Sequence, residues 1–202
     1  RTLLAGSVVS LLGKKHSVPA VVYFHYDWAM WKKYEKQWVD FAVAKMAEKT
    51  CIKFADLIIA TAPFLKDRLV KRGRKPEEIE VAPNHVNTSD FCKLDKKACR
   101  KRLNMPEGEK NLFFAGRLVF QKNIFTLITA LSQVQGVKAY IAGTGELEKK
   151  LKEFALEKQV AGRIWFLGII PQKKIVEYLN ACDVFVLPSF YEGSPKILLE
   201  SM

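Results

Sequence analysis

Apolar residues recur along the 202-residue chain with two different periods, and stretches of one kind alternate with stretches of the other. Short β-rich runs such as AVVYF predict strands, and runs with apolar residues three or four apart predict helices. In the first half, this pattern predicts strands at 19–25, 57–60 and 79–82 and helices at 2–13, within 27–55 and at 63–70. We expect the helix at 2–13 to lie in the core.

The second half shows a regular alternation of strands and helices. The predicted strands are 111–115, 137–142, 163–167 and 183–187, and the predicted helices are 122–132, 146–158, 172–180 and 195–202. Strands that alternate with helices of this length indicate βαβ units and a parallel, doubly wound sheet. The apolar run at 183–187 predicts a buried strand. A basic, partly helical stretch precedes these units, and we place the linker between two domains at about 88–110.

The net charge of +12 is the unusual feature of the composition, because the hydrophobic and charged fractions, 49% and 27%, are ordinary. Residues 1–100 hold 19 basic and 11 acidic residues, and residues 101–202 hold 14 and 10. The excess in the first half indicates an anionic partner, such as a membrane surface, a lipid phosphate or a nucleic acid.

The four cysteines form no C-x-x-C pair and the three histidines no H-E-x-x-H motif, so we expect neither a metal site nor a disulfide scaffold. Reduced thiols fit a cytosolic compartment best. No apolar stretch approaches the roughly 20 residues that span a bilayer. We therefore expect a cytoplasmic protein, which a membrane surface could hold at its cytoplasmic face.

The segment after the last predicted strand contains the most specific chemistry. It is a Pro/Ser/Gly loop that leads into a helix, with Ser194 as the expected cap and Pro195 at the helix start. Glu192 lies in the loop and Glu200 lies in the helix. A helix N-terminus at the carboxyl edge of a parallel sheet binds phosphate or sugar oxygens. Carboxylates accept hydrogen bonds from neighbouring hydroxyl groups, so the arrangement indicates a sugar nucleotide.

This segment, PSFYEGSPKILLE with Glu192-x7-Glu200, resembles the signature of retaining glycosyltransferases of the GT-B fold, especially their fourth family. FFAGRLVFQKNIFTLITAL at 113–131 is similar to the Gly-Arg-Leu-x-x-x-Lys donor motif of the family. Three further segments follow the family in the same order: Gly143-Thr-Gly145, IWFLGII at 164–170, and, more weakly, VAPNHVNTSDF at 81–91. In this last segment His85 replaces the usual glycine and Asn87 the usual aspartate, and we assign it no catalytic role.

The resemblance implies an α/β protein with two Rossmann-like parallel-sheet domains. Residues 1–95 would belong to the N-terminal, acceptor-side domain and 96–202 to the C-terminal domain, which binds the nucleotide sugar. It also implies that both domains are incomplete here: the opening strand and glycine loop of the first would be missing, and so would the final helices of the second. We therefore expect a fragment.

The resemblance also implies roles for individual residues. Arg117 and Lys122 would bind the diphosphate and offset its growing charge, Glu192 would contact hydroxyls of the transferred sugar, and His25 would face that sugar. Asp27 is a weaker candidate. The alternative is that Arg117 and Lys122 bind no ligand and are simply solvated cations on an exposed loop. The remaining donor-binding candidates are Gly116, Gly143, Gly145, Gly168, Gly193, Ser194, Pro195 and Glu200, with Glu200 on the ribose.

The chain has no D-x-D motif, so we expect no metal-held diphosphate and no cofactor beyond the nucleotide-sugar substrate. The cations and a helix dipole would replace the metal. For retention, the resemblance implies attack from the face of the leaving group, with the diphosphate helping to take the acceptor proton. The partners are then a nucleotide-sugar donor and a glycan or lipid-linked acceptor.

Three other functions stay open. A sugar-nucleotide epimerase shares the architecture and an acidic loop, and a non-catalytic nucleotide-sugar binding module would use the same donor site. A basic nucleic-acid-binding domain is disfavoured because the lysines are spread over every helix rather than on one face. The segment WAMWKKYEKQW at 28–38 fits an interfacial membrane patch, or else a core helix with a solvated face.

Overall fold

The computed structural model describes residues 3–25 and 38–202. These form two compact units, Arg1–Asn84 with Glu192–Pro195 and His85–Tyr191 with Lys196–Met202. Each unit is an α/β structure around its own parallel sheet.

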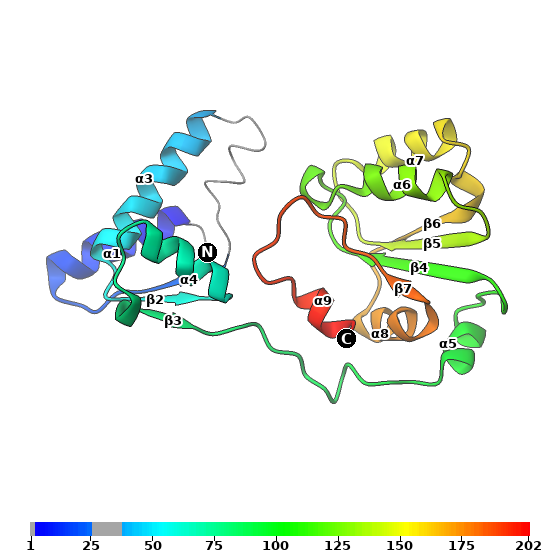
Figure 1. Ribbon diagram of the computed structural model, residues 1–202, viewed down its shortest axis with the longest axis horizontal. Coiled ribbons are helices and arrows are strands. Elements are labelled where there is room, and N and C mark those ends of the chain that lie inside the picture. The colour runs from blue at the N-terminus through cyan, green and yellow to red at the C-terminus, as the bar shows by residue number, and fades with distance from the viewer. Residues whose placement is uncertain (1–2, 26–37) are drawn as a thin grey trace. The chain divides into compact units, whose positions relative to one another are not determined.

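In the first unit, the described strands pair in the order β1-β2-β3, and all pairs are parallel. Buried residues of the strands, including Val22, Ile58 and Ile79, pack against Cys51 and Leu65 from two helices. Figure 1 shows α1, α3 and α4 on the same face of this sheet. The elements are α1 (Leu3–His16), β1 (Val21–Phe24), α3 (Trp38–Phe54), β2 (Leu57–Ala60), α4 (Pro63–Lys71), a 3₁₀ turn η1 (Pro76–Glu78) and β3 (Ile79–Val81).

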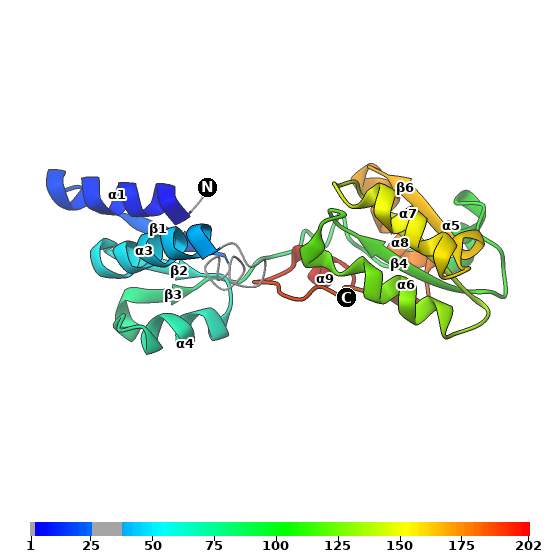
Figure 2. The ribbon, with the colours of Figure 1, turned by 90° about the horizontal axis from the view of Figure 1, so that it is seen from above.

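Helix α1 differs from the expected core helix, because it buries its small residues instead of its large ones. Ser10 is fully buried, and a Cβ on Gly6 would lie 3.4 Å from both the Cys51 Sγ of α3 and a methyl carbon of Val22. The large residues on the opposite side are 47–53% exposed; they are Val8, Val9, Leu11 and Leu12. Small residues are needed on the face of α1 that lies close to α3 and β1 (Figure 2). The periodicity of apolar residues in the sequence does not show which face of the helix this is.

In the second unit, the described strands form a parallel sheet with the order β6-β5-β4-β7. Figure 1 shows α6 and α7 on one face and α8 on the other. The elements are α5 (Lys96–Arg102), β4 (Lys110–Ala115), η2 (Phe120–Lys122), α6 (Ile124–Ser132), β5 (Val137–Ala142), α7 (Glu148–Glu157), η3 (Ala161–Arg163), β6 (Ile164–Gly168), α8 (Gln172–Ala181), β7 (Val184–Phe185) and α9 (Lys196–Glu200).

Two adjacent phenylalanines of β4 show how this sheet is covered. Phe114 belongs to the core under α6 and α7, and Phe113 belongs to the core with Tyr178 and Ala181 of α8. Both phenylalanines are fully buried, because successive side chains of a strand point to opposite faces. The predicted doubly wound parallel sheet is therefore confirmed.

The strand expected to be buried at 183–187 is instead short, and it lies at the edge of the sheet that the described residues form. Only Val184 and Phe185 form the ladder with β4, and Val184 is 55% exposed. An edge strand has a pairing partner on one side only, so a continuous apolar run does not by itself establish burial.

Asp183, just before β7, ties the helical segment at 96–102 to the sheet. Its carboxylate accepts hydrogen bonds from Lys96 Nζ at 2.7 Å, from Arg100 Nη2 at 2.9 Å and from the Asn111 backbone N–H at 2.7 Å. Burial alone would raise the pKa of this carboxyl, but the bonds from Lys96 and Asn111 and the nearby charges hold it below its ordinary value.

Asp183→Asn should lower the free energy of unfolding of the second unit by about 2 kcal/mol at neutral pH, because charge-assisted hydrogen bonds are lost. The stabilisation by a carboxyl with a lowered pKa is present above its unfolded pKa, and it is lost as the pH falls through the folded value. Urea unfolding should therefore show that, as the pH falls from about 5 to about 2, the free energy of unfolding decreases more steeply for the unmodified chain than for the variant. Equal slopes would contradict this role.

Candidate functional site

The carboxyl ends of three neighbouring strands meet at one edge of the second sheet. Ala115 of β4 pairs with Ala142 of β5, and Ala142 pairs in turn with Gly168 of β6. The predicted Gly116 and Gly143, which directly follow β4 and β5, and Gly168, the last residue of β6, therefore lie at the same level of the sheet. In open parallel sheets this edge is where ligands bind.

Backbone hydrogen bonds join the loop after β4 to the loop after β5. The Gly116 N–H donates to the Ala142 carbonyl at 3.0 Å, and the Leu118 N–H donates to the Thr144 carbonyl at 2.9 Å. The Leu147 N–H returns a bond to the Leu118 carbonyl at 3.1 Å. Leu118 is fully buried, so its side chain anchors the loop in the core as well.

Gly143 permits this close approach for steric reasons. Its φ is +121°, and a Cβ at this position would overlap the carbonyl oxygen of Gly116. A Cβ on Gly145 would likewise overlap the backbone of Leu118. Both glycines are thus needed for loop packing, whether or not they also approach a nucleotide.

A second set of bonds connects the loop after β4 with the loop after β7. The Phe190 N–H donates to the Gln121 carbonyl at 3.0 Å, and Gln121 Nε2 donates to the Tyr191 carbonyl at 2.7 Å. Asn123 Nδ2 donates to the Pro188 carbonyl at 3.2 Å. The structure therefore brings segment 116–123 against segment 188–191, which are 65 or more residues apart in the chain.

Gln121 and Asn123 are the connecting residues that the sequence analysis missed. Asn123 has a left-handed backbone, with φ of 50°, and asparagine tolerates this conformation better than most residues. Its position just before α6 was a detectable signal. For Gln121 the sequence holds no signal, because an exposed-looking glutamine in a loop is common.

The two predicted cations lie on this loop. Arg117 is exposed and has no hydrogen-bond or ion-pair partner among the described residues. Lys122 is half-buried, and a Cβ on Gly116 would lie 3.6 Å from its Cε, so its side chain folds back over the end of β4. The cations thus share the strand-end edge that the sequence analysis predicted for them.

The acidic segment follows directly after Tyr191. Glu192, Gly193, Ser194 and Pro195 belong to the first unit, where the Ser194 carbonyl accepts a bond from Asn84 Nδ2 at 2.5 Å. The meeting of Glu192 with the two cations stays a prediction.

Glu200 lies in α9 of the second unit, and its side chain is 12% exposed. Its Oε1 forms an ion pair of 3.4 Å with Lys196, one turn earlier in the same helix. Lys196 is 60% exposed, whereas the Glu200 carboxylate has little access to water, so solvent screens this pair only in part. The contact of Glu200 with a ribose hydroxyl stays a prediction.

His25 directly follows β1 in the first unit and is exposed. Its ring centroid lies 4.6 Å from that of Tyr23, and its backbone carbonyl accepts a bond from Thr61 Oγ1 at 3.0 Å. The role of its ring toward a donor sugar stays a prediction. Asp27 and most of the 28–38 segment lie outside the described residues; Trp38, at its end, is 61% exposed.

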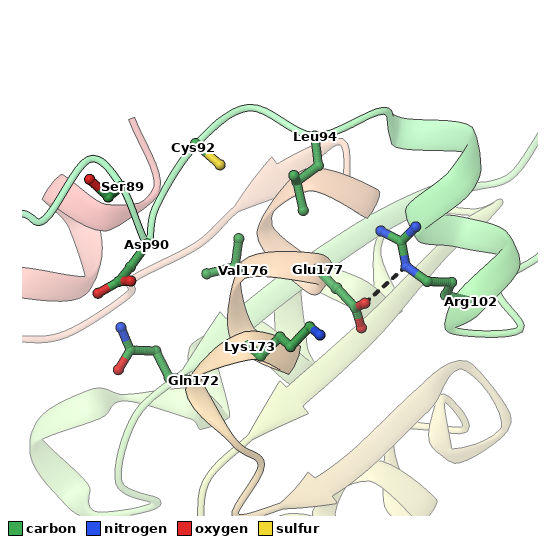
Figure 3. A pocket seen from close by; sticks show the side chains of 9 residues that line it. All are labelled: Ser89, Asp90, Cys92, Leu94, Arg102, Gln172, Lys173, Val176 and Glu177. Atoms are coloured by element: carbon green, nitrogen blue, oxygen red, sulfur yellow. Dashed lines mark hydrogen bonds and ion pairs between the residues drawn. The ribbon is translucent and has the colours of Figure 1, made fainter.

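The second unit also contains a cavity of about 680 Å³, bounded by the linker, the end of α5 and the first half of α8. Figure 3 shows Arg102 and Glu177 pointing toward each other at one side of it, with a bond of 2.9 Å from Nε to Oε1. Bonds from Lys174 and Arg102 lower the pKa of Glu177 although burial opposes this. No sequence-predicted site residue lines this cavity, so we keep the strand-end edge as the candidate site.

The described residues contain no group of three or more His, Cys, Asp or Glu side chains placed to hold a metal ion. Over the same residues, every helix is too short or too polar to traverse a bilayer. All four cysteines are free thiols.

Comparison with known proteins defines the class of this chain as the glycosyltransferases of the GT-B fold. The family model described as "Glycosyl transferases group 1" matches residues 95–202, and that described as "Glycosyltransferase Family 4" matches residues 2–90. The chain belongs to the group 1 glycosyl transferases, as the sequence motifs predicted.

Individual relatives agree with this assignment. The lipopolysaccharide core biosynthesis glycosyltransferase LpsE of Rhizobium meliloti (strain 1021) is 32% identical over 146 residues, which are 72% of this chain and 41% of LpsE. The alpha-maltose-1-phosphate synthase of Mycolicibacterium smegmatis is 27% identical over 217 residues, with 100% of this chain and 54% of the synthase covered. The chain thus spans about half the length of these relatives.

Solved structures confirm the expected fold. The sucrose-phosphate synthase from Thermosynechococcus elongatus matches with a TM-score of 0.88 and 22% identity, over 99% of this chain and 52% of that one. Anabaena Alr3699/HepE, solved in complex with UDP and glucose, matches with a TM-score of 0.80 and 20% identity, over 99% and 55% of the two chains.

Gly143→Ala should lower the free energy of unfolding of the second unit by about 2 to 4 kcal/mol, because it adds both a left-handed strain and an overlap with Gly116. Gly136→Ala is the matched control. Gly136 also has a positive φ, +69°, but a Cβ there would meet nothing within 4 Å, so we expect a loss of about 1 kcal/mol. If urea unfolding showed the same loss of unfolding free energy for both variants, the close approach of residue 143 to Gly116 would not be what requires a glycine there.

Proposed function

We propose that this chain forms the donor site of a retaining, metal-independent glycosyltransferase. The enzyme would move a sugar from a nucleoside-diphosphate sugar to a glycan or lipid-linked acceptor. The observation that carries the proposal is the convergence of three loops, 116–123, 143–147 and 188–191, at one edge of the second sheet.

The two cations suit a diphosphate. The planar guanidinium of Arg117 can bind two phosphate oxygens at once, and Lys122 adds a compact charge from the same loop. Negative charge grows on the diphosphate as the glycosidic bond breaks, so fixed positive charge lowers the energy of the transition state. A diphosphate oxygen then takes the proton of the attacking acceptor hydroxyl, and the new bond forms on the face that the diphosphate leaves.

The carboxylates would recognise hydroxyl groups. Glu192 would accept hydrogen bonds from the transferred sugar, with help from the backbone N–H groups of residues 193–195, and Glu200 would accept from the ribose. The complex of Alr3699/HepE with UDP and glucose supports a nucleotide sugar as the donor class, since the two chains share the fold.

Transfer separates this proposal from a non-catalytic binding module. A binding module would retain a nucleoside diphosphate sugar without consuming it, whereas the enzyme would release the nucleoside diphosphate. An epimerase would change the sugar without transferring it to an acceptor. The full reading frame is the material to use for this comparison, because its relatives are about twice as long as this chain.

Arg117→Ala and Lys122→Ala should each weaken binding of UDP, GDP or ADP by roughly ten- to a hundredfold, because each removes a charged partner of the diphosphate. Isothermal titration calorimetry with the three nucleotides measures this loss and also identifies the base. Lys149→Ala removes an exposed charge from α7 and should leave the affinity unchanged. Equal affinities in all variants would refute the assignment of Arg117 and Lys122.

Transfer should proceed at the same initial rate with and without EDTA, because the proposed charge stabilisation comes from side chains. The product should keep the anomeric configuration of the donor. Proton NMR of the first-formed product reports the configuration from the coupling constant of the anomeric proton. A requirement for added Mg²⁺ or Mn²⁺ would contradict metal independence. A product with inverted anomeric configuration would contradict the retaining mechanism.

A further inference from the structure

The cavity beside the linker has different chemistry at its two ends. All of its lining residues belong to the second unit, so the cavity lies within one compact body. Figure 3 shows Asp90 and Gln172 on one side of it. Arg102 and Glu177 lie on the other side, and the buried Val176 lies between the two sides. A volume of about 680 Å³ is typical of sites that hold a small organic molecule.

A buried carboxylate fixes Arg102 at its end of the cavity. Glu177 is 5% exposed, and its Oε1 accepts the 2.9 Å bond from Arg102 Nε. Arg102 Nη2 donates a second bond, of 3.1 Å, to Cys99 Sγ. The guanidinium is therefore held in one orientation and keeps further N–H groups that can donate to a ligand. Fixing an arginine in this way lowers the entropy that binding would otherwise lose.

The charges at this end of the cavity favour an anion. Glu177 Oε2 lies 2.8 Å from Lys174 Nζ, so the single carboxylate is balanced by two cations, Arg102 and Lys174. Lys173 also lines the cavity, and it has no hydrogen-bond or ion-pair partner among the described residues. A phosphate group carries up to two negative charges and several acceptor oxygens, which suits a guanidinium and an ammonium together.

The opposite end of the cavity suits hydroxyl groups. Ser89 and Asp90 of the linker and Gln172 of α8 are exposed there. Asp90 Oδ2 accepts a bond of 2.9 Å from Asn87 Nδ2, which leaves Oδ1 to accept from a ligand. The hydroxyl of Ser89 and the amide of Gln172 can both donate and accept. The negative charge of Asp90 disfavours an anionic group at this end, so the charge of a ligand belongs at the other.

We propose that this cavity binds a sugar phosphate, with the phosphate at Arg102 and Lys173 and the sugar hydroxyls at the Asp90 end. No residue of the candidate donor site lines the cavity, so the inference goes beyond the proposed function and does not rest on it. A free sugar or a free phosphate would use one end alone. The joined molecule should bind more tightly than either part, because its second contact forms within a complex that already exists.

Cys92 provides a direct measure of occupancy. It lines the cavity and is exposed, whereas Cys51, Cys99 and Cys182 are buried. Burial raises the pKa of Cys51 to about 11 and that of Cys182 to about 12, and it also raises the pKa of Cys99, so these three thiols react slowly. Iodoacetamide should therefore modify Cys92 first, and a ligand in the cavity should slow this reaction. Peptide mass spectrometry identifies the modified thiol.

The probes are glucose-6-phosphate, glucose-1-phosphate and mannose-6-phosphate, and glucose and inorganic phosphate represent their two parts. At least one sugar phosphate should protect Cys92 in the unmodified chain, with half-maximal protection at a lower concentration than glucose or inorganic phosphate requires. Lys173→Ala and Arg102→Gln should each raise that concentration about three- to thirtyfold. Asp90→Ala should raise it for the sugar phosphate and leave it unchanged for inorganic phosphate.

Lys101→Ala is the matched control, because Lys101 is an exposed cation next to Arg102 in α5 and does not line the cavity. It should leave the protection unchanged. Lys173→Ala tests the site without removing any bond to Glu177. The site would be overturned if no sugar phosphate protected Cys92, if all variants showed equal protection, or if inorganic phosphate alone protected as well as the sugar phosphates.

Arg117→Ala separates this site from the proposed donor site. It should leave the protection of Cys92 by the sugar phosphate unchanged while it weakens binding of nucleoside diphosphates. Protection that is lost in Arg117→Ala but retained in Arg102→Gln would place the sugar phosphate at the strand-end edge and overturn the inference. Protection that depends on Arg102 in a chain that binds no nucleoside diphosphate would refute the donor site and leave the cavity site standing.

Discussion

The candidate site depends on the close packing of two backbones. The Gly116 carbonyl occupies the space in which any side chain on residue 143 would begin, and hydrogen bonds on both sides hold the two loops at this distance. Arg117 lies between Gly116 and Leu118, whose N–H groups donate to Ala142 at the end of β5 and to Thr144 in the loop after it. The direction in which Arg117 leaves the sheet is therefore set by main-chain bonds and by the buried Leu118 side chain, which tolerate little adjustment.

A second loop supports the same edge from the other side. β7 contributes only two residues to the ladder, so the sheet alone holds the segment after it weakly. The bonds from Gln121 and Asn123 compensate for this, because they fasten the backbone at Pro188 and Tyr191 to the loop after β4. Hydrogen bonds within the protein thus hold the segment that leads to Glu192 next to Lys122, and no ligand is needed to bring these two segments together. Such preorganisation reduces the entropy that binding would otherwise lose.

The sheets, their parallel strands and the strand-end position of the cations could be predicted, because each follows from a local pattern that repeats along the chain. What could not be predicted depends on the neighbours of an element. The large residues of α1 are exposed because small residues such as Gly6 allow α1 to pack more closely against α3 and β1. The spacing of residues along a helix does not tell which of its two faces, the one with small residues or the one with large residues, is buried. Val184 is exposed because β7 pairs only with β4 among the described strands. The role of Gln121 depends on a loop about 70 residues away, and no local signal marks it.

The exposure of Arg117 is consistent with a binding role, since a guanidinium already paired with a carboxylate would have to exchange that partner for phosphate. In water, however, a single exposed charge contributes little to affinity, because solvent screens it. Affinity must therefore come from a ligand that contacts several groups at once and displaces water from them. The half-buried Lys122 provides such a neighbour within the same short segment. A nucleoside-diphosphate sugar brings further groups to the site along with its diphosphate and would gain from contacts beyond the two cations, whereas a simple anion would gain from the cations alone.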